Sequence, residues 1–525
     1  MKSFQSALEG TDAMSYIILF LCGILSALPY VIEYTFFLPY FALAPLFIVA
    51  STKKSAYRHG LSFSMGYYLV VFHWFLYLYP LDFAGIDKGG SIAVIAIAWF
   101  GLSLLQAVGT AFVPVLYRFL TKSNHRLFAP FVAASLWCIF EWAQNLFWFG
   151  VPWARIAVTQ HKILPIVQSA SIFGALGVGF LIVLISAFLA SAYLNYKDGK
   201  RIRCDVIVCI SIFLINFAFG LIHMNVKTES DNTITATAVQ GNIMSSDKWA
   251  DDSVGTSLEI YSSLTEEAVT KNGSSLVVWP ETVLICDLNF SSSLINEICK
   301  LSKRLNCYIA LGSFYSDESG SRNSVYLFSP DGELNETVYN KRRLVPFGEF
   351  LPMADFLYAL VPELKEINML DNPLTVGEAP NVFKTEIGNL GALVCFDSIY
   401  EYLTYDSVRA GAEMIILSTN DSWYKDSAAV RQHNGHAVLR SIESGRYTVR
   451  AANTGISTII TDKGKIIAQL DPLTTGHISE KVEFHSQKTV YSVTGNLIVV
   501  LSFAYVAFLS CFTAIKRYNN KKTVA

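Results

Sequence analysis

Charged residues are scarce in this chain of 525 residues: lysine, arginine, aspartate and glutamate together make up only 16% of it. Soluble proteins carry about 25% charge, whereas 52% of the residues here are hydrophobic. We therefore expect a large part of the chain to lie in lipid. An excess of one sign of charge is also absent, because the formal net charge is −2, and this balance argues against a nucleic-acid partner.

Metal-binding and redox motifs are absent as well. The nine cysteines include no CxxC pair and no cysteine–histidine spacing of a zinc site, so we expect no metal, no thiol–disulfide exchange motif and no other cofactor. Four cysteines fall in the region of soluble composition: Cys286, Cys299, Cys307 and Cys395. A disulfide among the first three stays open, because connectivity cannot be deduced from a sequence.

Long apolar stretches predict eight transmembrane helices. The first has no small-residue cleavage motif and others follow it, so we expect it to be retained rather than removed as a signal peptide. The eight stretches are 14–32, 35–51, 61–80, 91–117, 127–147, 164–194, 205–224 and 491–515. The chain thus divides into seven helices in residues 1–225, a catalytic domain in 226–487, and the eighth helix with a tail in 488–525.

Lysines and arginines near these stretches predict their orientation. Fourteen of them follow the even-numbered stretches, whereas three lie in the loops on the opposite side. Because positive charge is retained on the cytoplasmic side, we expect both termini there. Seven helices precede the soluble region, so this domain is expected on the far side of the membrane.

The soluble region alternates strands with helices. Apolar runs predict strands at 234–239, 276–279, 308–312, 390–394 and 414–418, and helical spacing predicts helices at 254–271, 291–305, 399–411 and 428–444. Hairpins are expected within 324–339 and 447–470. This α/β pattern favours a layered domain of two sheets covered by helices.

Three reactive side chains stand at the ends of such elements. Cys395 ends one apolar run, Glu281 ends another, and Lys341 precedes a Pro-Phe-Gly-Glu turn. A thiol delivered into a polar turn is how a fold presents a nucleophile, although a cysteine at the end of a buried strand is more often a core residue. Glu, Lys and Cys in this order resemble the triad of the nitrilase superfamily, whose αββα sandwich agrees with the layered domain.

This resemblance implies a role for each residue. Glu281 would act as general base, Cys395 as nucleophile, and Lys341 as a fixed positive charge that stabilises the oxyanion, with the backbone N–H of Phe396 as a second donor. The supporting residues are expected to be Glu349, Asp397, Trp249 and Asn323. For Asp397, a helix N-terminal position favoured by the macrodipole is an equal alternative.

Other polar and apolar residues leave alternatives open. We expect His433 to fix a helix or a loop rather than to act as a base. Glu141, inside the fifth stretch, is costly in lipid and hence a functional candidate, with interfacial solvation as an equal explanation. The apolar segment 351–378 is expected to form a lid that admits acyl chains.

The combination with membrane helices is narrower and closely resembles the apolipoprotein N-acyltransferase family. The motifs that carry this resemblance are Glu141-Trp142, Phe149 through Trp153, Val239 through Ile243 with Trp249, Trp279-Pro280-Glu281, Asn340-Lys341-Arg342, Leu344 through Glu349, Val394-Cys395, Ser418 through Trp423, and Gln432-His433 through Glu443-Ser444-Gly445-Arg446 to Arg450 through Gly455. The family usually has Cys-Tyr-Glu where this chain has Cys395-Phe396-Asp397. An outer-loop arginine and tryptophan of the family are Gln144 and Leu146 here, which leaves the headgroup contacts of that loop open.

The resemblance implies a ping-pong reaction. Cys395 would take an acyl chain from a phospholipid, expected to be phosphatidylethanolamine, and pass it to the α-amino group of a diacylglyceryl-cysteine lipoprotein. The enzyme would be a multi-pass monomer of the bacterial inner membrane with a periplasmic catalytic domain. A membrane-tethered nitrilase-type amidase is the alternative, whereas the intact triad and the few intramembrane charges argue against a transporter or scaffold. Acyl-chain and headgroup preferences stay open.

Overall fold

The structure is a computed structural model, and it describes residues 11–81, 86–122, 128–147, 149–244, 248, 253–360 and 373–524, without the side chains of residues 357, 360 and 517–524. The chain forms two compact units. The helical unit comprises Met1–Leu76, Val94–Asn225 and Asn496–Ala525, and the α/β unit comprises Tyr77–Ala93 and Val226–Gly495.

Apolar helices make up the first unit. They are α2 (Asp12–Ala27), α3 (Leu38–Ala42), α4 (Ala44–Thr52), α5 (Ala56–Val71), α6 (Lys88–Thr110, which begins in the second unit), α7 (Phe112–Thr121), α8 (Ala129–Ala143), α9 (Leu164–Val167), α10 (Ala170–Lys197), α11 (Arg203–Asn225) and α20 (Leu497–Val524). Within the described residues, six apolar helical segments are long enough to cross a membrane. Two shorter ones, Leu38–Thr52 and Ala129–Ala143, fall on the second and fifth predicted stretches. Several apolar helices of the predicted kind are therefore confirmed, and the count of eight spans stays a prediction.

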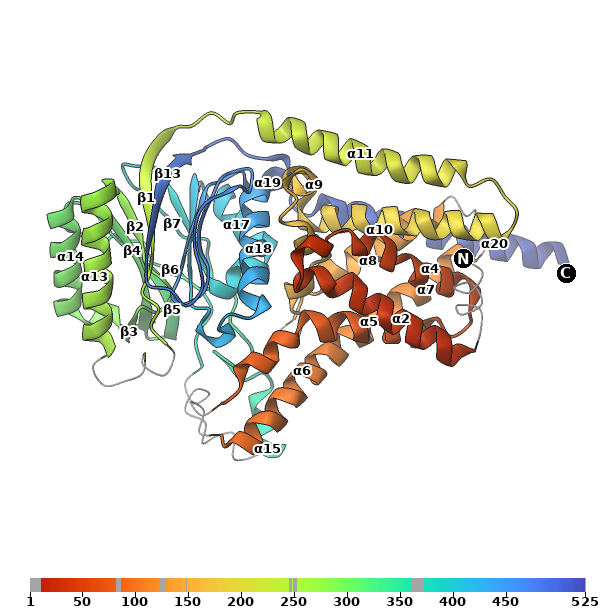
Figure 1. The fold of residues 1–525 in the computed structure, drawn as a ribbon, viewed down its shortest axis with the longest axis horizontal. Helices are drawn as coiled ribbons and strands as arrows, with labels where there is room; N and C mark the ends of the chain where they lie inside the picture. Colours follow the sequence, from red (N-terminus) through yellow and green to blue (C-terminus); the bar gives the residue numbers. More distant parts are fainter. Residues whose placement is uncertain are drawn as a thin grey trace. The chain divides into compact units, whose positions relative to one another are not determined.

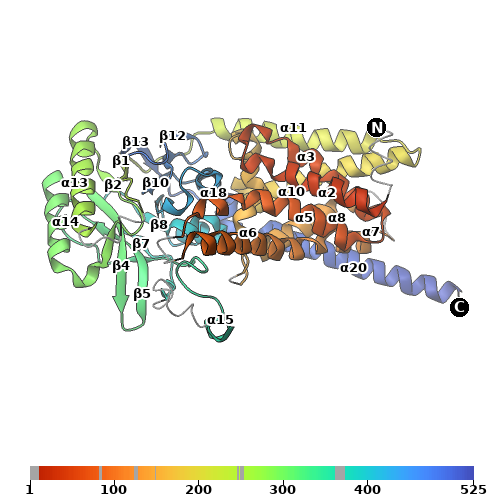
Figure 2. The same cartoon turned by 60° about the horizontal axis from the view of Figure 1, so that its bottom comes forward.

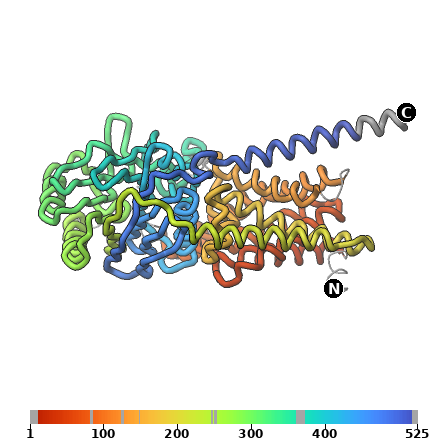
Figure 3. Tube along the Cα trace, turned by 90° about the horizontal axis from the view of Figure 1, so that it is seen from above, coloured from red at the N-terminus to blue at the C-terminus, as the bar shows by residue number. Residues whose placement is uncertain are grey.

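Helices α2 and α5 run side by side because glycines let their backbones touch (Figures 1 and 2). A Cβ on Gly23 would lie 1.9 Å from the carbonyl oxygen of Phe63, and one on Gly66 would lie 2.1 Å from that of Phe20. Small residues at such contacts are typical of membrane helix pairs. Helix α20 runs toward the end of this unit at which α2 starts (Figure 3).

Two β-sheets form the centre of the second unit. The first has the order β13-β1-β2-β4-β5-β6, with β3 also paired to β4. Its strands are β1 (Asn232–Gln240), β2 (Leu276–Val278), β3 (Leu284–Asp287), β4 (Tyr308–Asp317), β5 (Gly320–Phe328), β6 (Tyr339–Asn340) and β13 (Gly476–Phe484). The second has the order β12-β11-β10-β9-β8-β7. Its strands are β7 (Val382–Phe383), β8 (Leu390–Val394), β9 (Met414–Thr419), β10 (Thr448–Ala452), β11 (Ser457–Ile460) and β12 (Ile466–Leu470).

Helices cover the outer faces of both sheets, as Figure 1 shows. Helices α13 (Ser253–Asn272) and α14 (Ser292–Leu305) pack on the first sheet, and α17 (Glu401–Arg409) and α18 (Ala428–Ser444) pack on the second. Two short helices, α15 (Ala354–Leu360) and α19 (Val490–Thr494), complete the unit. A core that includes Val278, Leu327, Val394 and Ile416 fills the space between the sheets. The predicted α/β layering of this region is therefore confirmed.

The hairpin predicted between 324–328 and 337–339 is present, because Ser324 and Val325 of β5 pair antiparallel with Asn340 and Tyr339. A second pairing was not predicted: β5 begins at Gly320 and pairs antiparallel with β4 over its whole length. Asp317 faces Gly320 across a tight turn, and the φ of Gly320 is 126°, a conformation that glycine adopts at little cost. The expected partner is reduced to β6, two residues at the edge of the sheet.

Candidate active site

Strand β8 delivers Cys395 into a turn. The five residues of β8 are buried and pair in parallel with β9, and Cys395 opens the short 3-10 helix Cys395–Ile399. Its φ is 48°, a left-handed conformation that costs a residue other than glycine about 1–3 kcal/mol and is therefore typical of functional sites. Burial, followed by the charge of Glu281, raises the pKa of the Cys395 thiol, whereas the charge of Lys341 opposes that rise.

Glu281 follows β2 and is 5% exposed. Its Oε1 accepts hydrogen bonds from Lys341 Nζ at 2.9 Å and from Asn323 Nδ2 at 2.7 Å. Its Oε2 accepts from the backbone N–H of Asn420, the residue after β9, at 2.8 Å. A carboxylate held by donors on both oxygens has a fixed orientation, as a general base requires.

Lys341, directly after β6, is buried between two carboxylates. Its Nζ lies 2.9 Å from Glu281 Oε1 and 2.8 Å from Glu349 Oε1. Burial alone lowers the pKa of Lys341, but the charges of Glu281 and Glu349 more than reverse this and raise it well above its usual value. Asn323 donates to Glu349 Oε1 at 3.1 Å as well, so it bridges both carboxylates. The ammonium therefore stays charged and in place.

Asp397 connects the cysteine turn to the lysine segment. Its carboxylate accepts from the hydroxyl of Tyr339 at 3.0 Å and from the N–H groups of Val394 at 3.1 Å and Arg343 at 2.8 Å. Burial raises its pKa to about 6, although the charge of Lys341 and these hydrogen bonds oppose the rise. The carboxylate thus contacts the start of its own 3-10 helix through Val394 and the segment after Lys341 through Arg343. Both the helix-terminal and the supporting interpretation of Asp397 are compatible with these contacts.

The structure thus brings together Glu281, Lys341, Cys395, Glu349, Asn323 and Asp397. Phe396 is buried, and its ring packs edge-on against Tyr400 with centroids 5.5 Å apart. Trp249 lies outside the described residues. So does 361–372 of the expected lid segment, whereas Phe356 on α15 is 62% exposed.

Lys248 is a further candidate site residue, which the sequence analysis missed. Its buried Nζ donates to the carbonyl oxygen of Glu281 at 3.1 Å and to Thr282 Oγ1 at 2.9 Å. Burial lowers its pKa to about 8, against the opposing charges of Glu281 and Cys395. Its position directly before Trp249 in a family motif was the available signal.

One group of side chains in the described part of the chain has the spacing of a metal site: Cys395, Asp421 and His433. The Arg450 guanidinium lies 2.6 Å from Asp421 Oδ2 and already supplies a positive charge there. The other carboxylate oxygen lies 2.8 Å from His433 Nδ1. These side chains therefore have partners within the protein that suit a hydrogen-bonded network better than a cation.

The two outer-loop residues of interest lie inside the helical unit. Glu141 is 3% exposed and accepts from the N–H of Ile156 at 2.9 Å. Gln144 is buried and donates to Gln106 Oε1 at 2.9 Å and to the hydroxyl of Tyr68 at 3.2 Å. Both side chains therefore fasten the loop to its own unit.

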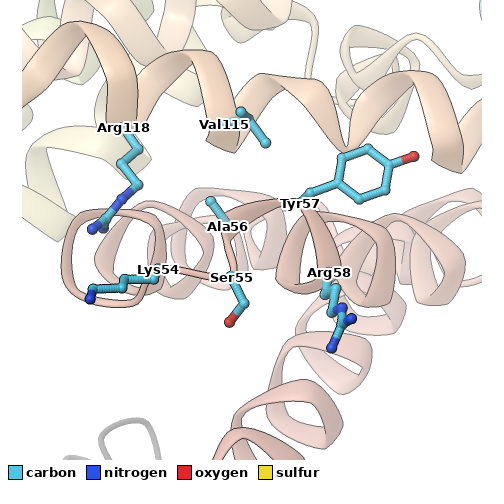
Figure 4. A pocket seen from close by; sticks show the side chains of 7 residues that line it. All are labelled: Lys54, Ser55, Ala56, Tyr57, Arg58, Val115 and Arg118. Carbon is cyan, nitrogen blue, oxygen red and sulfur yellow. The ribbon is translucent and has the colours of Figure 1, made fainter.

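A cavity of about 320 Å³ lies between α5 and α7 (Figure 4). Its lining includes none of the candidate site residues and consists of Lys54, Ser55, Ala56, Tyr57, Arg58, Val115 and Arg118. Arg118 donates to the carbonyl oxygen of Ala50 near the end of α4 at 3.0 Å, a common position for a cation. The basic residues that line the cavity, Lys54, Arg58 and Arg118, follow the second and fourth predicted stretches, on the side predicted to be cytoplasmic.

Comparisons with known proteins match both units. A family model described as carbon-nitrogen hydrolase matches residues 235–488, and one described as apolipoprotein N-acyltransferase N-terminal domain matches residues 22–188. The apolipoprotein N-acyltransferase of Geobacter metallireducens is 28% identical over 95% of each chain. That of Haemophilus influenzae is 27% identical over 99% of this chain and 100% of the relative.

Among solved structures, the Saccharomyces cerevisiae protein Nit3, a member of branch 10 of the nitrilase superfamily, is 18% identical. The match covers 48% of this chain and 91% of that one, with a TM-score of 0.38.

Proposed function

We propose, since the chain belongs to the apolipoprotein N-acyltransferase family, that it moves an acyl chain from a phospholipid to the N-terminus of a lipoprotein. The acceptor is the α-amino group of an N-terminal S-diacylglyceryl-cysteine, and the donor is phosphatidylethanolamine. The reaction runs through a Cys395 thioester in two half-reactions that share one site.

In the first half-reaction, Cys395 Sγ attacks the ester carbonyl of the phospholipid, and its proton passes to Glu281. The negative charge that develops on the carbonyl oxygen is stabilised by Lys341 and by the N–H of Phe396. The tetrahedral intermediate then collapses to the thioester. The lysophospholipid leaves as an alcohol and takes the proton from Glu281.

In the second half-reaction, the neutral α-amino group of the lipoprotein attacks the thioester carbonyl. The same two donors stabilise the oxyanion. Glu281 accepts a proton from the nitrogen and returns it to the sulfur as the carbon–sulfur bond breaks. The products are an amide on the lipoprotein and the free thiol of Cys395.

One observation carries this proposal: the buried Lys341 ammonium lies within 2.9 Å of Glu281, and both charges act on the Cys395 thiol. A base, a cation and a nucleophile thus share one enclosed site, as acyl transfer through a thioester requires. Glu349 and Asn323 hold the lysine, and Asp397 holds the turn that carries the cysteine. These contacts support positioning roles for Glu349, Asn323 and Asp397. A supporting role for Trp249 rests on its place in a shared motif.

The apolar helices and the family of the chain support a location in the bacterial inner membrane. We infer a helical part in residues 1–225, a catalytic domain in 226–487 and a final helix with its tail in 488–525, all in a monomer. The excess of lysine and arginine after alternate helices supports cytoplasmic termini and a periplasmic catalytic domain. Helix α20 runs toward the end of the helical unit at which α2 starts, which is consistent with termini on one side (Figure 3).

Mass spectrometry of the intact protein, extracted with native lipid, tests the proposal. An acyl adduct is expected on Cys395, and a diacylated peptide should remove it and gain the acyl chain. The Cys286→Ala variant provides the matched control, because Cys286 lies in the same unit and contacts Ser313 rather than the site. Release of free fatty acid with no acylated peptide would indicate the amidase instead.

A further inference from the structure

A buried polar group beside Cys395 has no part in the two half-reactions. His433 on α18 is buried, and its Nε2 lies 3.1 Å from the carbonyl oxygen of Cys395 and 2.9 Å from Ser398 Oγ. Its Nδ1 lies 2.8 Å from Asp421 Oδ1. The other oxygen of Asp421 accepts from Arg450 at 2.6 Å. Arg450 therefore fixes Asp421, and Asp421 fixes the imidazole ring of His433.

The hydrogen-bonding capacity of these groups determines which atoms donate. Burial disfavours the charge of Asp421, but Arg450 and His433 together hold the pKa of this carboxyl well below its usual range. An ionised carboxylate can only accept, so Nδ1–H of His433 donates to it. The hydroxyl of Ser398 donates to the carbonyl of Cys395 at 2.8 Å, which leaves its oxygen to accept from Nε2–H. With a donor on each ring nitrogen, His433 is the imidazolium ion, paired with the carboxylate of Asp421.

The carbonyl of Cys395 is therefore held by two neighbouring donors, Ser398 Oγ–H and His433 Nε2–H. This carbonyl and the N–H of Phe396 belong to one peptide group. Because that group is planar and trans, the two bonds point in opposite directions. Donors that fix the carbonyl on one side thus aim the Phe396 N–H toward the other side, and they polarise it as a donor.

We propose that His433 is a positioning residue that aims the Phe396 N–H at the oxyanion of the acyl-transfer reaction. The left-handed backbone of Cys395 makes this peptide orientation costly unless its surroundings hold it. Asp421 and Arg450 set the orientation of the imidazole, and the imidazole sets the orientation of the peptide. The inference rests on the thioester chemistry proposed above.

The test compares two reactions of the same thiol in the purified full-length chain. Acylation by p-nitrophenyl butyrate passes through an oxyanion, whereas alkylation by iodoacetamide is a direct displacement that forms none. For His433→Ala we expect acylation to slow by about 10–100-fold, part of what losing an oxyanion donor costs, and alkylation to change by less than about threefold. With phospholipid as donor, kcat should fall while KM stays near its original value.

The matched control is Asn434→Ala on the same helix. Asn434 is buried and accepts from Thr458 Oγ1 at 2.9 Å, away from the cysteine turn, so both reactions should keep their rates. Where His433→Ala does not fold, Ser398→Ala removes the other donor to the same carbonyl and should slow acylation alone.

Two results overturn the inference by itself. The first is acylation at the original rate in both variants, and the second is a parallel loss of acylation and alkylation, which would mean that His433 acts on the thiol or on the fold. A wild-type chain that p-nitrophenyl butyrate and phospholipid both fail to acylate would instead overturn the thioester chemistry, and the inference with it.

Discussion

Each of the two units buries a glutamate, and the partners of the two carboxylates differ. Glu141 in the helical unit accepts from the backbone N–H of Ile156 and so fastens a loop. Glu281 in the α/β unit shares Lys341 with Glu349, and its charge acts on the Cys395 thiol. Their exposures are almost equal, at 3% and 5%. Burial alone therefore does not distinguish the two carboxylates, whereas the charged groups beside Glu281 make it the candidate base.

The strongest test of this comparison removes the thiol. Cys395→Ala should abolish acyl transfer and the acyl adduct while leaving membrane insertion unchanged, because no other group in the proposed mechanism can hold the acyl chain. Cys395→Ser should be nearly as inactive, since a hydroxyl is a much weaker nucleophile. Intact mass and peptide acylation provide the measurements, and substantial turnover in either variant contradicts the thioester.

Changing the partners of the thiol should have the next largest effect. Glu281→Gln removes the base and Lys341→Ala removes an oxyanion donor, so each should slow acyl transfer by at least about 100-fold. Single-turnover formation of the acyl adduct measures this loss. An adduct that forms at the wild-type rate in Glu281→Gln would show that another group takes the proton.

Asp397 provides an intermediate case, a buried carboxylate held by a hydroxyl and by backbone N–H groups. Folding raises its pKa from 3.8 to about 6, so the folded chain binds more protons than the unfolded chain between these pH values. Stability should therefore fall by about 2–3 kcal/mol as the pH rises from 4 to 6, a loss that Asp397→Asn should remove. Thermal unfolding of both proteins at pH 4, 5 and 6 measures the difference, and identical slopes contradict it.

The smallest effect is expected at Glu141. In Glu141→Gln the amide oxygen can still accept from Ile156, so acyl transfer should change by less than about threefold. This variant is the counterpart of Glu281→Gln, because the chemical change is the same and both residues are buried. A loss of rate equal to that of Glu281→Gln would remove the distinction between the two carboxylates.

Periodic elements of the α/β unit could be predicted from the sequence, and polar edge strands could not. Helix α18 begins and ends where the helical spacing places it, at Ala428–Ser444. Strand β13 was missed because 476–484 is mostly polar and partly exposed, as expected of a strand at the edge of the sheet. Its partner β1 is distant in sequence, so no local pattern indicates the pairing.

The candidate site divides in the same way. Glu281, Lys341 and Cys395 stand in recognisable motifs at the ends of apolar runs, so the sequence was sufficient to propose them. The contacts that hold them were not predictable, because Asn420 bonds to Glu281 through its backbone N–H and His433 bonds to the backbone of Cys395. Such contacts depend on tertiary packing, and backbone donors and acceptors are common to every residue type.

The pairing of β1 with β13 has a consequence for biogenesis. Asn232 lies opposite Phe484 and Gln240 lies opposite Gly476, so the first strand of the α/β unit pairs with its last strand (Figure 1). During synthesis one edge of β1 stays unpaired until more than two hundred further residues have been made. In the proposed topology these residues must also be translocated before the two strands can pair. Such a high contact order slows folding. A nascent chain interrupted before residue 476 therefore exposes an open sheet edge, which is a template for aggregation and a target for quality-control proteases.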